Sequence, residues 1–128
     1  MIKIIIDTRE QTPWHFPPEL ASVSRGTLRT GDYALAGDPL YAIERKSLDD
    51  FVGTISSGWE RFTKEIERMD ALAARTVIVE ASINDIQEHN YNHPRVPPGF
   101  ILKRIAELSL RNVSVLLCDN PISAAGMC

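Results

Sequence analysis

Short apolar runs at three places constrain the fold of this chain more than any other feature of its sequence. Residues 2–7 are apolar and rich in β-branched side chains, and further apolar runs lie at residues 75–81 and 113–117. Such runs are typical of strands that are buried inside a sheet. The first run ends in Asp7, so we expect polar side chains where that strand leaves the sheet.

The sequence between these runs predicts a hairpin and several helices. Residues 26–36 and 40–46 have strand composition and are separated by Gly37-Asp38-Pro39, which predicts an antiparallel hairpin. Ser47 and Ser82 are capping signals for helix N-termini. Helices are expected at residues 47–55, 59–74 and 100–110, with a further short helix after Asn120.

The order of these elements indicates the fold class. Strands and helices alternate after residue 47, whereas the hairpin comes before it. This order predicts an α/β fold: a mixed central sheet with an N-terminal antiparallel hairpin, flanked by helices on both faces. Residues 11–18 contain three prolines around Trp14 and Phe16, which predicts an irregular loop. Its aromatic side chains either anchor the loop to the core or stack on an unpaired base.

Size and composition limit the class of protein. A chain of 128 residues is enough for one compact domain, which we expect to span residues 1–128. Its net charge of -3 excludes a generally basic, DNA-coating protein but allows a local basic surface around an acidic pocket. No apolar run approaches the ~20 residues that cross a bilayer, and the N-terminus does not resemble a signal peptide. The two cysteines cannot form a disulfide framework, so we expect an intracellular protein, cytoplasmic or in the nucleoid or nucleus.

The segment Glu44-Arg45-Lys46 carries the first chemical signal. Successive side chains of a strand point to opposite faces, so Glu44 and Lys46 project together and Arg45 projects to the reverse face. A carboxylate that binds a divalent cation, beside a lysine that orients or deprotonates water, suits a metal-dependent phosphodiesterase. On its own, a Glu-x-Lys pair is more often a solvated ion pair.

Two further acids are expected near this pair. Asp32 follows Gly31, at a position that suits a bend in the chain, and the hairpin places it close to level with Glu44. Asp7 lies at the end of the neighbouring strand. Carboxylates at that range require a cation, and Mg²⁺ accepts one or two carboxylates together with water and phosphate oxygens. Zinc is disfavoured because it takes His or Cys ligands.

Taken together, these segments resemble a known family. Asp7-x-Arg9-Glu10, Gly31-Asp32-Tyr33 and Glu44-Arg45-Lys46-x-x-x-Asp50 are similar to the signature of the XPF-type nuclease domain, a branch of the restriction-endonuclease-like superfamily with an Asp…Glu-x-Lys core. The similarity extends loosely over residues 51–69 and 118–121 and so covers most of the chain. It implies a metal-dependent endodeoxyribonuclease that hydrolyses branched or flapped DNA in repair, recombination or replication, with Mg²⁺ or Mn²⁺ as cofactor.

The resemblance also implies roles for individual residues. Asp32 and Glu44 are implied as metal ligands with Asp7 nearby, and Lys46 as the catalytic lysine. Candidate DNA contacts are Arg9, Arg45, Arg61 and Lys64, although Arg9 and Lys64 are also explained as surface ion pairs with Glu10 and Glu60. Glu10, Gly31 and Asp50 complete the motif as supporting positions. Asp50 is equally explained as an acid in the first turn of a helix.

Two other functions compete with this interpretation. The first is a non-catalytic, DNA-binding scaffold that positions an active nuclease, and the second is a restriction- or resolvase-like nuclease that follows sequence. Helix–hairpin–helix modules usually follow the nuclease domain in this family, and none is present in these residues. Nuclease domains of this type often pair through their own helices, so a homodimer or a heterodimer is expected. Candidate contacts are Ile101, Ile105, Leu108 and the Cys128 end, although burial in the domain's own core is the default expectation for the first three.

Overall fold

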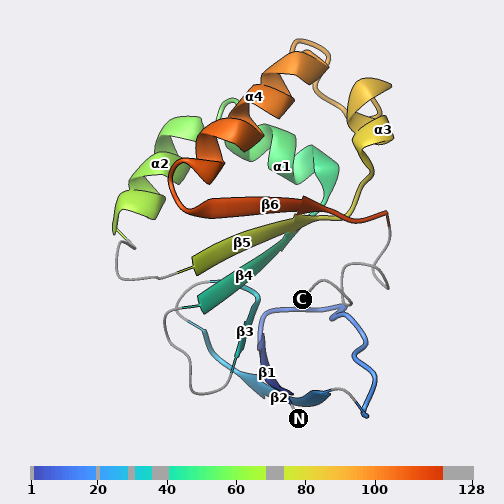
Figure 1. Cartoon of the computed structure of the whole chain (residues 1–128), viewed down its shortest axis with the longest axis vertical. Coiled ribbons are helices and arrows are strands. Elements are labelled where there is room, and N and C mark those ends of the chain that lie inside the picture. Colours follow the sequence, from blue (N-terminus) through green and yellow to red (C-terminus); the bar gives the residue numbers. More distant parts are fainter. Residues whose placement is uncertain (1, 20, 29–30, 36–40, 69–73, 120–128) are drawn as a thin grey trace.

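Six strands form one mixed sheet in the computed structural model, which describes residues 2–19, 21–28, 31–35, 41–68 and 74–119 (Figure 1). The sheet order is β2-β1-β3-β4-β5-β6. The strands are β1 (Ile2–Asp7), β2 (Ala21–Gly26), β3 (Tyr33–Leu35), β4 (Tyr41–Lys46), β5 (Ala74–Val79) and β6 (Val113–Leu117). The bounds of β1 and β6 confirm the predicted strands at both ends of the chain.

The sheet is divided into a parallel half and a half of mixed direction. β4, β5 and β6 run parallel to one another, whereas β3 is antiparallel to both β1 and β4. The predicted hairpin is therefore present as β3 and β4, with Tyr33 opposite Ile43. Its turn at residues 37–39 lies outside the described residues.

The prediction of one continuous strand over residues 26–36 is wrong. The chain forms β2 instead, which ends at Gly26 and runs parallel to β1, and β3 begins only at Tyr33. β2 was missed because it is an edge strand whose Ser22, Val23, Ser24 and Arg25 side chains are all exposed. An edge strand buries too little to leave an apolar pattern in its sequence.

Within the described residues four helices follow the hairpin, and the first and third begin where the capping signals at Ser47 and Ser82 predict. They are α1 (Leu48–Ile55), α2 (Trp59–Arg68), α3 (Ile83–Gln87) and α4 (Pro98–Ser109). Ser47 accepts a hydrogen bond from the Asp50 amide, and Ser82 forms a complete capping box with Asp85. The expected helix to residue 74 is too long, because Ala74 already begins β5. The short helix expected after Asn120 lies outside the described residues.

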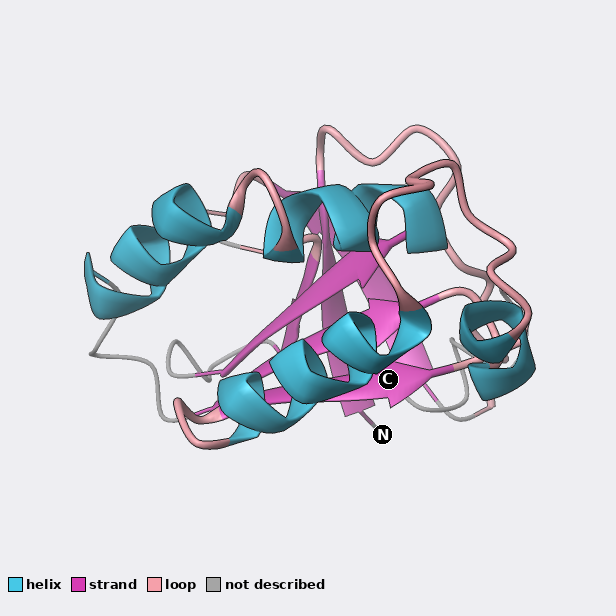
Figure 2. Cartoon of the chain, turned by 90° about the horizontal axis from the view of Figure 1, so that it is seen from above, coloured by secondary structure: helices cyan, strands magenta, loops and turns pink. Residues whose placement is uncertain are grey.

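The helices leave one part of the sheet open. All four contribute to a core cluster with Val77 and Val79 of β5, and Figures 1 and 2 show them gathered over the β4–β6 half of the sheet. This arrangement confirms the mixed α/β fold with a helix-flanked sheet. The prediction of helices on both faces is met on one face of the described residues. The opposite face is covered there by the proline-rich loop, since Trp14 and Phe16 pack against Tyr33.

The burial of individual side chains decides two expectations, one on base stacking and one on dimer contacts. Trp14 is 3% exposed, so it anchors the loop and does not offer its ring to a base. Ile101 and Leu108 of α4 are fully buried in the chain's own core, which confirms the default expectation for them and removes them as candidate dimer contacts. In the part of the chain that the structure describes, none of the helices combines the length and the apolarity that a membrane crossing requires.

Candidate active site

Asp32 is positioned by the main chain between two strands. Its amide donates to the carbonyl oxygen of Ile43 at 2.8 Å, and its carbonyl oxygen accepts from the Asp7 amide at 2.8 Å. Gly31 precedes it with φ of +78°, and a Cβ there would lie 2.9 Å from the Ile43 carbonyl oxygen. Only glycine fits this close approach without strain. The bend predicted at Gly31 is thus the feature that joins Asp32 to both β1 and β4.

The Asp32 carboxylate is held by the backbone of β4, the strand that carries Glu44 and Lys46. Its Oδ2 accepts a hydrogen bond of 2.8 Å from the amide of Arg45. Burial raises the pKa of Asp32 above its ordinary value, the Arg45 amide opposes that shift, and the charges of Glu10 and Glu44 add to it. The pKa of Asp32 therefore reflects its burial first and the neighbouring carboxylates second.

Asp7 is buried at the end of β1, and both of its carboxylate oxygens accept hydrogen bonds from residues later in the chain. Its Oδ2 accepts from Nε of Arg9 at 2.7 Å, and its Oδ1 accepts from the Leu28 amide at 2.9 Å. These hydrogen bonds, with that of Arg9 the strongest, lower the pKa of Asp7 to about 2. The Arg9 side chain is itself 71% exposed, so its guanidinium pairs with Asp7 while facing solvent.

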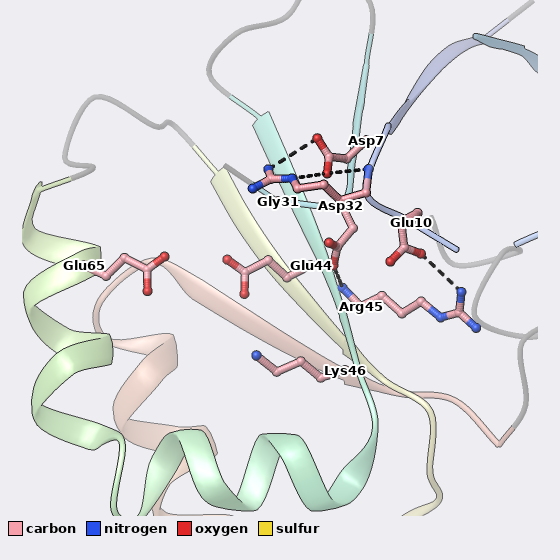
Figure 3. A pocket seen from close by; sticks show the side chains of 9 residues that line it. Asp7, Glu10, Gly31, Asp32, Glu44, Arg45, Lys46 and Glu65 are labelled. Carbon is pink, nitrogen blue, oxygen red and sulfur yellow. Dashed lines mark hydrogen bonds and ion pairs between the residues drawn. The ribbon is translucent and has the colours of Figure 1, made fainter. Parts of the chain in front are cut away.

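β4 presents its charged residues on two faces, as the alternation predicts. Glu44 and Lys46 extend to one side of the strand and Arg45 to the other (Figure 3). Arg45 forms ion pairs with Glu10 at 3.2 Å and with Glu80, and its guanidinium lies over the Trp14 ring. The structure therefore places Arg45 and Glu10 in a network that fastens the proline-rich loop to β4.

Glu44 meets two charged residues that no motif predicts. Arg75 of β5 forms an ion pair with Oε1 of Glu44 and a second one, at 3.4 Å, with Glu65 of α2. In Figure 3 the Glu65 side chain points from α2 toward Glu44. Glu44 of β4 is thus linked through Arg75 of β5 to Glu65 of α2.

The side chains meet in an open pocket of about 420 Å³. It is lined by Asp7, Arg9, Glu10, Gly31, Asp32, Glu44, Arg45, Lys46 and Glu65. A second pocket of about 250 Å³ shares Glu44, Lys46 and Glu65 with the first and adds Arg61. A third is lined by Arg61, Lys64, Glu67 and Arg68. Consecutive pockets share residues, so the acidic centre is connected to the basic surface of α2.

Not every predicted residue reaches this pocket. Lys64 pairs with Glu60 at 3.2 Å and lies on the basic surface beyond Arg61. Asp50 is exposed in the first turn of α1 and does not line any of these three pockets. The structure thus brings together the acids and the lysine of the motif, while Asp50 stands as an acid in the first turn of α1, the position that the sequence also allows.

Comparisons with known proteins agree with this geometry. A family model described as the ERCC4 domain matches residues 6–127 of the chain. This chain belongs to the ERCC4-domain family. A search of curated proteins finds no significant match.

Solved structures share the fold of this ERCC4 domain. XPF from Aeropyrum pernix is 20% identical with a TM-score of 0.67, and the match covers 98% of this chain and 57% of that one. The XPF from Aeropyrum pernix solved in complex with DNA is 21% identical with a TM-score of 0.75, covering 99% of this chain and 61% of that one. The chain therefore spans less than two-thirds of either structure, and the resemblance to the XPF-type nuclease fold is confirmed.

The fit of a divalent cation to this ERCC4 domain can be judged from its acids. Across the described ranges, no three His, Cys, Asp or Glu side chains gather closely enough to hold a metal ion. Asp32 and Glu44 both line one pocket, so two carboxylates face the same space. Because Mg²⁺ accepts one or two carboxylates with water and phosphate oxygens, these two residues fit it. Asp7 as a third ligand stays a prediction, since Arg9 occupies its carboxylate.

Sequence reasoning missed three charged residues around the site of this ERCC4 domain. Arg75 and Glu80 flank the apolar centre of β5. In the sequence they are visible only as one charged residue at each end of an apolar run. Glu65 lies on α2 among alternating acids and bases, which is the pattern of any solvated helix face. Their positions near Arg45 and Glu44 depend on how α2 and β5 pack against β4.

Proposed function

We propose that this ERCC4-domain chain is a metal-dependent endodeoxyribonuclease that hydrolyses phosphodiester bonds in branched or flapped DNA during repair, recombination or replication. The observation that carries the proposal is that Asp32, Glu44 and Lys46 line the same open pocket. Two carboxylates and an amine in one solvent-accessible site suit phosphodiester hydrolysis. The family membership and the fold shared with XPF support it.

Each residue has a part in this proposal that its position allows. Asp32 and Glu44 would hold Mg²⁺ or Mn²⁺, which supplies charge neutralisation at the phosphate and lowers the pKa of bound water. The Arg45 amide keeps the Asp32 carboxylate in place. Lys46, on the face of β4 that carries Glu44, orients the attacking water or takes its proton.

The basic residues give the DNA strand a path through the site. Arg9 is exposed on the Asp7 side of the central pocket, and Arg61 lines the adjoining pocket with Glu44 and Lys46. Phosphates bound at Arg9 and Arg61 would leave the phosphate between them at the acidic centre. Lys64 extends the same positive surface along α2. Arg45 is the weakest of the predicted DNA contacts, because its guanidinium is occupied by Glu10 and Glu80.

Cleavage of a flapped duplex in Mg²⁺ or Mn²⁺ tests the proposal. Asp32→Ala and Glu44→Ala should each abolish measurable cutting while DNA binding persists, because they remove ligands and leave Arg9 and Arg61 intact. Glu88→Ala, which removes an exposed carboxylate outside the three pockets, is the matched control. Undiminished cleavage by either site variant would refute the assignment.

The competing functions give different results with the same substrates. A scaffold would bind flapped DNA and never cut it with either metal, whereas a restriction- or resolvase-like enzyme would cut plain duplex at fixed sequences. A panel of flap, fork, nick and plain duplex DNA separates the three. Pairing with a second copy or with a related chain is part of the proposal, and sedimentation of the purified protein measures it.

A further inference from the structure

Arg75 is the most deeply buried basic side chain among the described residues. It is 4% exposed and extends from β5 into the space between β4 and α2. Its Nη2 donates to Oε1 of Glu44 and, at 3.4 Å, to Oε1 of Glu65. The guanidinium lies 5.3 Å from the centre of the Phe62 ring. Three elements of the fold therefore meet at one charged group.

This burial is costly, and nothing in the packing repays it fully. Nε and Nη1 of Arg75 are buried and have no hydrogen-bond partner within the described part of the chain. Unsatisfied buried donors destabilise a protein, and an apolar residue of similar volume often serves a core better than a buried ion pair. A residue kept in this state points to a role other than stability.

The charge of Arg75 has a direct effect on Glu44. Arginine keeps its positive charge in a protein, so it remains a donor to the carboxylate beside it. Arg75 binds Oε1 of Glu44, and among the described residues Oε2 of Glu44 has no hydrogen-bond partner. One oxygen is thus committed to the protein, and the other stays available to a ligand in the pocket that Glu44 lines.

Arg75 also affects which group Lys46 can pair with. A glutamate and a lysine two residues apart on one strand face commonly pair with each other. Here Glu44 pairs with Arg75 instead, and within the described ranges Lys46 has no carboxylate oxygen within 4.0 Å. The Lys46 ammonium is therefore free to face a ligand in the two pockets that it lines.

We propose that Arg75 is a positioning residue of this site: it holds one oxygen of Glu44, leaves the other oxygen free for a cation, and keeps Glu44 from pairing with Lys46. Glu65 shares the Arg75 guanidinium and fixes it from the helix side. The inference rests on the proposed function, because it assigns Glu44 to a cation. Arg75 is buried and acts only through Glu44, so it contacts neither DNA nor water in the pocket.

Direct titration with Mn²⁺ tests the inference without relying on cleavage. Binding to the unsubstituted chain is measured by calorimetry or by the loss of the free-ion electron paramagnetic resonance signal, with Glu44→Gln defining the Glu44-dependent part. Arg75→Met should weaken that part by about 10–100-fold, the range found when a ligand loses its supporting partner. In flap cleavage, kcat should fall by a similar factor while KM for DNA stays unchanged.

The matched control is the same substitution at another partly buried arginine. Arg104 lies against the rings of Trp59 and Phe100 and donates to the Ile55 carbonyl, remote from the acidic pocket. Arg104→Met should leave Mn²⁺ affinity unchanged within twofold. Arg75→Lys keeps the buried charge but cannot span both carboxylates, so it should lose part of the affinity. If Arg75→Met does not fold, Arg75→Lys is titrated in its place, provided that its unfolding midpoint equals that of the unsubstituted chain.

The outcomes separate this inference from the proposed function. Glu44-dependent Mn²⁺ binding that stays within twofold of the unsubstituted chain, or tightens, in a folded Arg75 variant would overturn the role of Arg75 and leave the proposed function intact. An unsubstituted chain with no Glu44-dependent binding would overturn both. Loss of affinity in both Arg75→Met and Arg104→Met would reduce the effect to general destabilisation and overturn the inference as well.

Discussion

The main-chain amide of Arg45 donates a 2.8 Å hydrogen bond to Oδ2 of Asp32. A backbone donor cannot be removed by evolution or mutation without breaking the strand, so the orientation of this carboxylate is built into the pairing of β3 with β4. The side chain of Arg45 lies on the other face, where it joins Glu10 to Glu80. The main chain of Arg45 thus holds Asp32, while its side chain fastens β4 to the proline-rich loop and to the residue after β5.

Asp32→Asn should raise the thermal midpoint of the metal-free protein at neutral pH. An acid whose folded pKa is raised destabilises the fold at pH values above that pKa, because the unfolded state accommodates its charge better. Asparagine removes the charge and can still accept the Arg45 hydrogen bond. The rise should disappear as the pH falls through the raised pKa, where Asp32 itself becomes neutral.

Asp50→Asn is the control for that measurement. It removes an exposed acid from the first turn of α1, where a negative charge is favourable by about 0.3–1 kcal/mol. Its midpoint should therefore stay the same or fall slightly. A lower midpoint for Asp32→Asn than for the unsubstituted protein would contradict the electrostatic account of Asp32.

Gly31→Ala should destabilise the protein by about 1–3 kcal/mol, the cost of holding a residue with a Cβ in a strained backbone conformation. The φ of +78° and the 2.9 Å approach to the Ile43 carbonyl both oppose a side chain at this position. Denaturant unfolding measures the loss. Because Asp32 follows directly, flap cleavage should fall further than stability alone explains.

Gly99→Ala provides the comparison within the same chain. A Cβ at Gly99 meets nothing within 4 Å, and the residue lies in α4, where alanine is favoured over glycine by up to about 1 kcal/mol. We expect unchanged or slightly higher stability. Equal losses at both glycines would argue against a special conformation at Gly31.

The sequence predicted the part of the site that depends on local geometry. Alternation along β4 places Glu44 and Lys46 together, and a glycine before Asp32 indicates a bend, and both expectations agree with the structure. Arg75 and Glu65 were not predictable in the same way. Their roles arise where α2 and β5 pack against β4, and neither segment shows a pattern that differs from an ordinary helix or strand.

β2 shows the same limit at the level of the fold. Its polar Ser22, Ser24 and Arg25 are compatible with a loop, and only the unpaired edge of β1 makes them a strand. Arg25 then serves the site indirectly, since it donates to the carbonyl oxygens of Thr8 and Glu10 at 3.4 and 2.6 Å and so shapes the turn after Asp7. Tertiary pairing, more than local propensity, decides such elements.

Arg9→Gln should raise the pKa of Asp7 from about 2 toward its ordinary value, because the Arg9 side-chain hydrogen bond is the largest cause of the shift. A lowered folded pKa gives stability that is present above the unfolded value of 3.8 and is lost as the pH falls toward 2. The variant should therefore lose less stability than the unsubstituted protein between about pH 5 and pH 2.

Carbon-detected NMR of the Asp7 carboxyl measures this pKa directly. Arg25→Gln serves as the control, because it removes a neighbouring arginine whose hydrogen bonds among the described residues all go to backbone oxygens. Its Asp7 pKa should stay near 2, within a few tenths of a unit. An unchanged pKa in Arg9→Gln would show that the Leu28 amide alone holds the Asp7 carboxylate ionised.

Arg45→Met and Arg61→Met should separate folding from DNA binding. Arg45 pairs with Glu10 and Glu80, so its loss should destabilise the chain by about 1–3 kcal/mol, as expected when part-buried acceptors lose their donor. Arg61 is exposed and lines two pockets beside the acidic centre, so its loss should leave stability unchanged. If Arg61 neutralises a phosphate, its removal lowers the slope of log affinity against log salt by about 1.

Flap-DNA affinity measured from 50 to 200 mM salt, together with urea unfolding, distinguishes the two arginines. A reduced salt slope for Arg45→Met at unchanged stability would return Arg45 to the DNA-contacting surface and contradict its position against Trp14.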